Sequence, residues 1–222
     1  ERAPPAPWRG VAFDEASLQQ LRYAALLHDF GKVGVREHVL VKADKLHAHE
    51  LELVRARFDL ARAGLENERL RARLEERADG PVAESQRELD ALWEVVVAAN
   101  RPTVLPAEAS ARLAAIAGRT FLDPRGEPRA LLTPLELSCL SIPKGSLSEA
   151  ERKEIEGHVT HTFRFLSEIP WTRALRRVPE IAYGHHEKLD GRGYPRAVPA
   201  DGIAVETRMM TISDIYDALT AS

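Results

Sequence analysis

The sequence predicts an all-α protein, for three reasons. Apolar residues recur at intervals of three and four along most of the chain, which is the period of an amphipathic helix. Aromatic residues make up only 6% of the sequence, so Leu, Val, Ile and Ala must fill most of the core. The pattern contains no strand-rich region. The length of 222 residues allows one domain or two, and the net charge of −3 argues against a dominant nucleic-acid surface.

The first helix should begin at a cap on Asp14 or Ser17, ahead of an apolar stripe at helical spacing. It should deliver His28 and Asp29 at its C-terminal end, where a glycine-containing turn follows. Residues 35–41 are then expected to be extended.

A long charged segment changes the character of the chain. Residues 46–78 should form one helix, residues 84–100 a second and residues 106–118 a third, followed by a loop at 123–126. The first of these helices carries a narrow apolar stripe made of Leu51, Val54, Phe58, Ala61 and Leu65. Such a stripe is typical of a coiled-coil seam. We therefore expect residues 46–133 to be a helical-hairpin insertion that projects as an arm and mediates dimerisation.

The chain from residue 134 onward should complete the globular core with further helices. These helices are expected to present polar side chains together with their apolar faces. The polar side chains are His158 on a helix opened by the capping box Ser148–Glu151, His185 and His186 on a helix at 179–188, and Asp214 on a helix at 206–220.

Imidazole and carboxylate groups spread over several helices are ligands that suit Fe, Mn, Zn, Co or Ni, and they do not distinguish among these metals. A metal pair held in this way lowers the pKa of a bridging water and clamps both oxygens of an in-line displacement at phosphorus. Each group alone is a weak signal, because a lone His-Asp pair or a single helix histidine is usually structural. All of them together favour a metal centre.

Two stretches resemble the HD-GYP family, which are bacterial metal-dependent cyclic di-GMP phosphodiesterases among the HD phosphohydrolases. They are HDFGK at 28–32 and HHEKLDGRGYP at 185–195. The interval from Ser148 to His158 and the stretch ISDIYDALT at 212–220 are similar to the family as well. The resemblance covers roughly residues 14–45 and 134–222, and it implies an HD-type helical bundle interrupted by the insertion.

The resemblance implies a role for each matching residue. The implied metal ligands are His28, Asp29, His158, His185, His186 and Asp214, with Asp29 as a bridge between metals. Lys32 would contact the scissile phosphate and act in catalysis with Asp29. The loop that shapes the substrate pocket would contain Gly191, Gly193, Tyr194 and Pro195. The implied cofactors are two or three divalent transition metals, with Fe or Mn favoured.

The implied activity is hydrolysis of cyclic di-GMP to the linear dinucleotide pGpG, with GMP as a further product. One alternative is an HD phosphohydrolase that acts on another nucleotide. A second alternative, from a different class, is a catalytically silent cyclic-dinucleotide sensor or interaction module.

Three departures from the family pattern affect these expectations. The family carries a further ligand histidine on a preceding helix, it continues past the Asp-Ala-Leu-Thr segment with basic residues, and it lacks the insertion. The chain as given is therefore expected to bind metal poorly and to hydrolyse cyclic di-GMP slowly or not at all. The expected division is a linker-like segment 1–13, a first core part 14–45, the insertion 46–133 and a second core part 134–222.

The remaining expectations concern partners and surroundings. The Pro-rich start indicates fusion to an N-terminal sensory domain, and the insertion indicates a homodimer. The single cysteine, Cys139, excludes an internal disulfide and fits a reducing, cytoplasmic location. We expect no DNA partner and no membrane span. Structural or solvated roles are expected for His38, His47, His49, His161, Trp8, Trp93 and Trp171.

Overall fold

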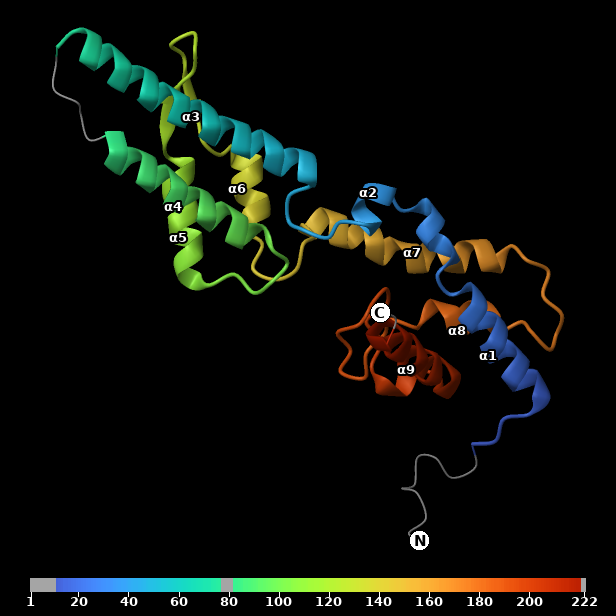
Figure 1. The fold of residues 1–222 in the computed structure, drawn as a ribbon. Coiled ribbons are helices and arrows are strands. Elements are labelled where there is room, and N and C mark those ends of the chain that lie inside the picture. Colours follow the sequence, from blue (N-terminus) through green and yellow to red (C-terminus); the bar gives the residue numbers. More distant parts are fainter. Residues whose placement is uncertain (1–10, 77–81, 221–222) are drawn as a thin grey trace. The chain divides into compact units, whose positions relative to one another are not determined.

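The computed structural model describes residues 11–76 and 82–220, and the chain is mostly helical, which confirms the all-α prediction. The chain divides into two compact units (Figure 1). Unit 1 consists of the chain up to Leu40 together with Arg152–Ser222, and unit 2 is Val41–Glu151. Trp8 and most of the linker-like segment lie outside the described residues.

Unit 1 is a small group of helices in which α1 packs against α8 and α9. Its elements are α1 (Glu15–Leu27), the 3-10 helix η2 (Phe30–Gly34), α2 (Glu37–Leu40), most of α7 (Glu149–Ser167), α8 (Val178–Tyr183), the 3-10 helix η3 (Ala200–Gly202) and α9 (Val205–Thr220). Asp14 caps α1 as predicted, because its carboxylate accepts the backbone N–H of Ser17 at 2.8 Å. The capping box of Ser148 and Glu151 is also confirmed at the start of α7.

Two predictions in unit 1 are wrong. Residues 35–41 are not extended, because α2 forms within them and turns Val39 into the core, where it is 1% exposed. The helix expected at 179–188 ends at Tyr183. Gly184 follows as its C-cap, so His185 and His186 lie in the turn after α8 and not on the helix.

Unit 2 is built on the helical hairpin of α3 and α4. Its elements are α3 (Ala48–Leu74), α4 (Val82–Asn100), α5 (Ala107–Ala117), β1 (Thr120–Leu122), β2 (Pro128–Ala130) and α6 (Pro134–Leu140). The strands pair antiparallel, with Phe121 opposite Arg129. The loop expected at 123–126 is the turn of this small hairpin, where the Asp123 carboxylate accepts the backbone N–H groups of Arg125 and Glu127 at 2.9 Å. Three-residue strands are too short to produce a recognisable alternation, so the sequence pattern missed them.

The proposed seam on α3 lies inside unit 2. Val54 and Phe58 are 0% exposed and Ala61 is 6% exposed, because this stripe packs with residues of α4, α5 and α6 in one hydrophobic core. The expectation that this stripe forms a coiled-coil seam is therefore wrong. A helical hairpin closed by α5 and α6 covers a narrow stripe completely. The packing roles expected for Trp93, Trp171 and Cys139 agree with their contacts, since Trp93 and Cys139 pack on this core and Trp171 on the core of unit 1.

The two ends of unit 2 lie together. The Lys42 ammonium contacts both carboxylate oxygens of Glu151 at 2.7 and 2.9 Å, and the hydroxyl of Ser146 donates to the carbonyl of Lys42. The Lys42 side chain is only 3% exposed, so this ion pair is largely removed from water. The unit thus begins earlier, at Val41, and ends later, at Glu151, than the insertion expected at 46–133.

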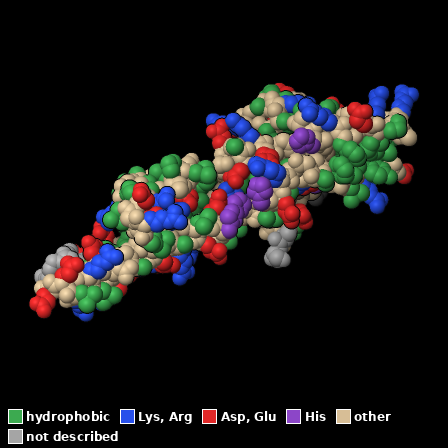
Figure 2. Space-filling view, turned by 90° about the horizontal axis from the view of Figure 1, so that it is seen from above, with side chains coloured by type: hydrophobic (Ala, Val, Ile, Leu, Met, Phe, Trp, Pro, Cys, Tyr) green, Lys and Arg blue, Asp and Glu red, His purple; other side chains and the backbone are tan. Residues whose placement is uncertain are grey.

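Charged side chains of both signs are interspersed on the face shown in Figure 2. In the described part of the chain, none of the helices has the length and apolar character that crossing a membrane requires.

Candidate metal centre

The six side chains predicted as metal ligands converge within unit 1. His28 and Asp29 follow α1, His158 projects from α7, His185 and His186 follow α8, and Asp214 projects from α9. The ring of His185 lies 4.8 Å from that of His28, 5.5 Å from that of His158 and 4.0 Å from that of His186, measured between centroids. Oδ1 of Asp214 lies 3.4 Å from Nε2 of His28. Four separate segments therefore meet at one point.

Asp29 lies at the centre of this cluster. Its Oδ1 is 3.2 Å from Nε2 of His158 and 4.0 Å from Nε2 of His185. Its Oδ2 is 3.3 Å from Nε2 of His28 and 2.7 Å from Nζ of Lys32. The two oxygens of one carboxylate thus face different sets of groups, which is the arrangement that a bridging ligand needs.

Three of the imidazoles are oriented by their own backbone. In His28, His158 and His185, Nδ1 donates to the carbonyl three residues earlier, so Nε2 carries the lone pair that faces the cluster. An outer hydrogen bond of this kind accompanies most metal-bound histidines. These three Nε2 atoms and Oδ1 of Asp29 are buried and have no hydrogen-bond partner among the described residues.

A cation fits this site. A buried polar atom without a partner costs about 1–3 kcal/mol, and four of them gathered at one point require compensation. The possible ligand atoms form two groups within 4.8 Å, His158 with His185 and His186, and His28 with Asp29 and His185. Because the groups share His185, they are neighbouring parts of one centre. Nitrogen and carboxylate oxygen donors suit first-row transition metals.

The electrostatics of Asp29, His185 and His186 favour the protonation states that bind metal, whereas the contact with Asp29 raises the pKa of His28. Burial alone would raise the pKa of Asp29, but contacts with His158, His28 and Lys32 outweigh it and hold that pKa far below its ordinary value. Burial lowers the pKa of His185 to about 4. Burial and repulsion from the charge of His185 lower the pKa of His186 to about 3. The carboxylate is therefore ionised and these two imidazoles are neutral at pH 7, as ligation requires.

A close approach between the turn after α1 and α7 sets the distance across the centre. The N–H of Gly31 donates to Oγ1 of Thr162 at 2.8 Å, and this hydroxyl donates to the carbonyl of His28 at 2.8 Å. A Cβ on Gly31 would lie 2.0 Å from the carbonyl oxygen of His158, so only glycine fits. Sequence reasoning missed Thr162. Its position four residues after His158, on the same helix face, was the available signal.

Glu187 organises the loop that carries the expected substrate-binding residues. Its side chain is 0% exposed, and its two oxygens accept the backbone N–H groups of Arg196 at 2.8 Å and Val198 at 3.1 Å. One buried carboxylate therefore holds the far end of the loop beside the ligand pair His185 and His186. Sequence reasoning gave Glu187 no role, although it lies within the motif that follows these histidines.

The loop itself packs against His186, one of the candidate ligands. The N–H of Tyr194 donates to the carbonyl of His186 at 3.3 Å, and the two rings lie 4.7 Å apart. Gly191 has φ of +72°, and a Cβ on Gly193 would lie 2.3 Å from the backbone nitrogen of Lys188, so both positions favour glycine. Pro195 follows, half-buried, after Tyr194. Burial raises the pKa of Tyr194, which keeps its phenol protonated.

The other candidate histidines of the described chain lie apart from the two ligand groups. His161 is exposed and its ring faces Gly34 and Gly157, which agrees with the structural role expected for it. His47 and His49 belong to unit 2, where their rings stack at 5.7 Å. His38 lies on α2 and is exposed.

Residues 129–222 match the family model described as HD domain. This segment supplies four of the six clustered side chains, His158, His185, His186 and Asp214. The match agrees with the arrangement of neutral imidazoles and a carboxylate around Asp29.

Curated relatives match a part of the chain. A protein named 3′3′-cGAMP-specific phosphodiesterase 3, from Vibrio cholerae serotype O1, is 44% identical over 77 residues, which are 35% of this chain and 16% of that protein. A probable cyclic di-GMP phosphodiesterase of the same organism is 48% identical over 48 residues, 22% of this chain and 11% of the relative. A cyclic di-GMP phosphodiesterase of Thermotoga maritima is 34% identical over 77 residues, 35% of this chain and 21% of the relative. The chain thus spans about a fifth or less of these relatives, and the matches confirm the resemblance stated above.

Proposed function

We propose that the chain is a metal-dependent phosphodiesterase that hydrolyses cyclic di-GMP, because residues 129–222 match the family model described as HD domain. The observation that carries the proposal is the set of buried Nε2 and Oδ1 atoms around Asp29 that lack hydrogen-bond partners among the described residues. The names of the partial relatives support the same reaction class.

The residues of the centre divide into proposed metal ligands and a lysine that would contact the phosphate. His28, His158, His185, His186 and Asp214 would hold the metals, with Asp29 as the ligand that they share. The bound metals supply an activated water and a Lewis acid for attack at phosphorus. Lys32 is half-exposed beside Oδ2 of Asp29, so its ammonium can contact an oxygen of the scissile phosphate and offset the charge that develops there.

The loop after His186 contributes substrate binding. Gly191 and Gly193 let the backbone turn tightly and approach a ligand, and Pro195 follows the ring of Tyr194. That ring packs near a guanine base or supports the loop that does so. The product is pGpG, and a second round of hydrolysis yields GMP. A second substrate, 3′3′-cGAMP, is favoured by the name of the Vibrio cholerae relative that is 44% identical.

Two or three divalent ions, Fe or Mn, complete the proposal. The mixed imidazole and carboxylate donors support both metals without choosing between them. We further propose a cytoplasmic location, in keeping with the single cysteine, a homodimer formed through the insertion, and regulation by an N-terminal sensory domain.

The test is a product assay on anaerobically purified protein. The protein is loaded with Mn or Fe and incubated separately with cyclic di-GMP, with 3′3′-cGAMP and with a linear dinucleotide, and the products are separated by ion exchange. We expect slow formation of pGpG from cyclic di-GMP, only with saturating metal present, and no product from the His185→Ala variant. Faster turnover of 3′3′-cGAMP than of cyclic di-GMP would identify 3′3′-cGAMP as the preferred substrate. Tight binding of cyclic di-GMP without turnover, at full metal occupancy, would favour a sensor and overturn the proposal.

A further inference from the structure

Helix α3 carries a second apolar stripe that the core of unit 2 does not use. Exposed residues recur at alternating intervals of three and four over three heptads. They are Leu53, Leu60, Asn67 and Leu74 at a positions, and Ala56, Ala63 and Leu70 at d positions. The four leucines are between 43% and 86% exposed. This pattern is the heptad repeat of a coiled coil.

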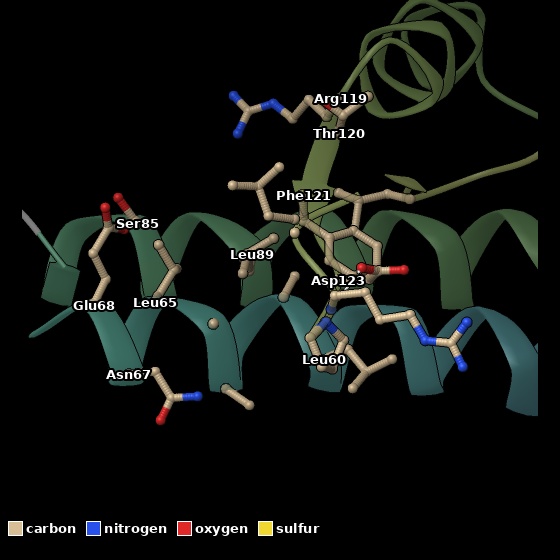
Figure 3. A pocket seen from close by; sticks show the side chains of 18 of the residues that line it. Leu60, Leu65, Asn67, Glu68, Ser85, Leu89, Arg119, Thr120, Phe121 and Asp123 are labelled. Atoms are coloured by element: carbon tan, nitrogen blue, oxygen red, sulfur yellow. Dashed lines mark hydrogen bonds between the residues drawn. The ribbon is translucent and has the colours of Figure 1, made fainter. Parts of the chain in front are cut away.

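The second stripe faces away from the core. Successive residues of a helix are rotated by about 100°, which places the second stripe on the side of α3 opposite Val54, Phe58 and Ala61. Figure 3 shows Leu65 pointing toward α4 and Asn67 pointing away from it; Leu60 and Asn67 also line the cavity drawn there, which α3 shares with α4 and the β1–β2 hairpin. The hairpin of β1 and β2 approaches α3 near Gly64, where a Cβ would lie 3.9 Å from the carbonyl of Leu122. The leucines of the second stripe nonetheless stay open to solvent.

We propose that this stripe is the contact surface for a second copy of the chain, and that the two α3 helices run parallel and in register. Asn67 supplies the argument for orientation. In a parallel pair each Asn67 meets its equivalent, and the two amides can hydrogen bond across the seam, which fixes register. In an antiparallel pair of the same span, each Asn67 would lie opposite Ala56 of the second copy, and its amide would be buried without a partner.

The charges beside the stripe favour the same orientation. Position g is acidic at Glu52, Asp59 and Glu66. Position e holds Arg71, which makes no ion pair within the described residues. A parallel pair places Glu66 of each copy near Arg71 of the other, at a spacing of five residues. Arg57, also at e, is already held by Glu136 and by the carbonyl of Leu131. Glu66 pairs with Arg69 of its own helix at 2.6 Å, so its contact with Arg71 of the second copy would share or replace that pair.

The first test is the mass of the chain in solution, measured by light scattering over a range of concentrations. We expect a dimer for the unmodified chain and a monomer for the Leu60→Glu/Leu74→Glu variant, with unchanged helicity by circular dichroism. The matched control is Leu135→Glu, because Leu135 is 70% exposed on α6 of the same unit and lies outside the stripe. It should remain dimeric. A monomeric unmodified chain overturns the proposal, and so does a double variant that keeps the dimer mass.

The second test addresses orientation by cross-linking. In a Cys139→Ser background the described chain has no other thiol, so an Asn67→Cys variant reports only on that position. We expect it to form a disulfide-linked dimer under mild oxidation. If instead Asn67→Cys cross-links with an Ala56→Cys chain and not with itself, the helices are antiparallel and the proposed orientation is wrong. Neither measurement depends on enzymatic activity.

Discussion

Adding a single methyl group at Gly31 should disable the metal centre. The new Cβ would lie 2.0 Å from the carbonyl oxygen of His158, 2.6 Å from the amide nitrogen of Thr162 and 2.8 Å from its hydroxyl. Real Cβ contacts stay above 3.0 Å, so the turn after α1 and helix α7 must separate by about 1 Å, the difference between 3.0 and 2.0 Å. Two of these obstacles are backbone atoms, which cannot rotate away.

That movement is large on the scale of metal coordination. Ligand distances vary by only about 0.2 Å in a working site, whereas Asp29 and His158 would be pulled apart by several times that amount. We expect metal affinity to fall at least ~10–100-fold, as it does when a supporting group is lost. A displacement of about 1 Å can also cost about 100-fold in turnover. Overpacking should lower the free energy of unfolding by about 1–3 kcal/mol.

The assay compares Gly31→Ala with Gly34→Ala, which lies in the same 3-10 helix. A Cβ on Gly34 meets only the ring of His161, at 3.7 Å, an ordinary contact. Bound Mn is measured by elemental analysis after equilibration at fixed free metal, and turnover is measured on cyclic di-GMP. Gly34→Ala should match the unmodified chain in both. If Gly31→Ala retains the same metal content and turnover as Gly34→Ala, the close approach does not set the geometry of the centre and the reasoning is refuted.

Three other changes test separate parts of the site. Lys32→Met should lower turnover by about 100-fold or more while metal content stays the same, because the ammonium is expected to act on the phosphate; equal loss of metal would assign it to the ligand shell instead. Glu187→Gln should lower the free energy of unfolding by about 1–3 kcal/mol, since a buried backbone N–H loses its acceptor. The control, Glu180→Gln at an exposed pair with Arg196, should change it little. Equal effects of the two substitutions in a urea titration would contradict this. Chelation should lower the melting temperature, and Mn at 100 times its Kd should restore about 2.7 kcal/mol of the free energy of unfolding. A melting temperature that neither treatment changes would mean that the cluster holds no metal.

Much of the helical architecture could be predicted because periodicity and caps act locally. The helix starts at Asp14 and Ser148 could be predicted because each cap side chain accepts a backbone N–H only three residues away. Local pattern could not decide which stripe of α3 meets the core. Both stripes have helical period, and the choice depends on α5 and α6, which lie far along the sequence. The small hairpin around Asp123 was missed for a related reason, because its strands are too short to alternate.

The proposed ligand set came from the resemblance to the HD-GYP family, whereas the contacts that support these residues could not be predicted in this way. His185 and His186 were predicted on a helix and lie in the turn beyond it, since Gly184 ends α8 early. Thr162 and Glu187 contribute through backbone groups of remote segments, and such contacts leave no trace in a motif. The residues expected to bind metal could thus be proposed from the sequence, whereas the residues that fix the distances between them could be identified only from the structure.

The ion pair between Lys42 and Glu151 bears on how the centre assembles. His28 and Asp29 precede unit 2 in the chain, and His158, His185, His186 and Asp214 follow it, so unit 2 is a tether between the two halves of the ligand set. If unit 2 were unfolded, closing so long a loop would cost about 4 kcal/mol in chain entropy. Folded, with its ends joined by this largely buried pair, it presents both halves at a high effective concentration. A unit that contributes no ligand can therefore control metal affinity through its own folding equilibrium.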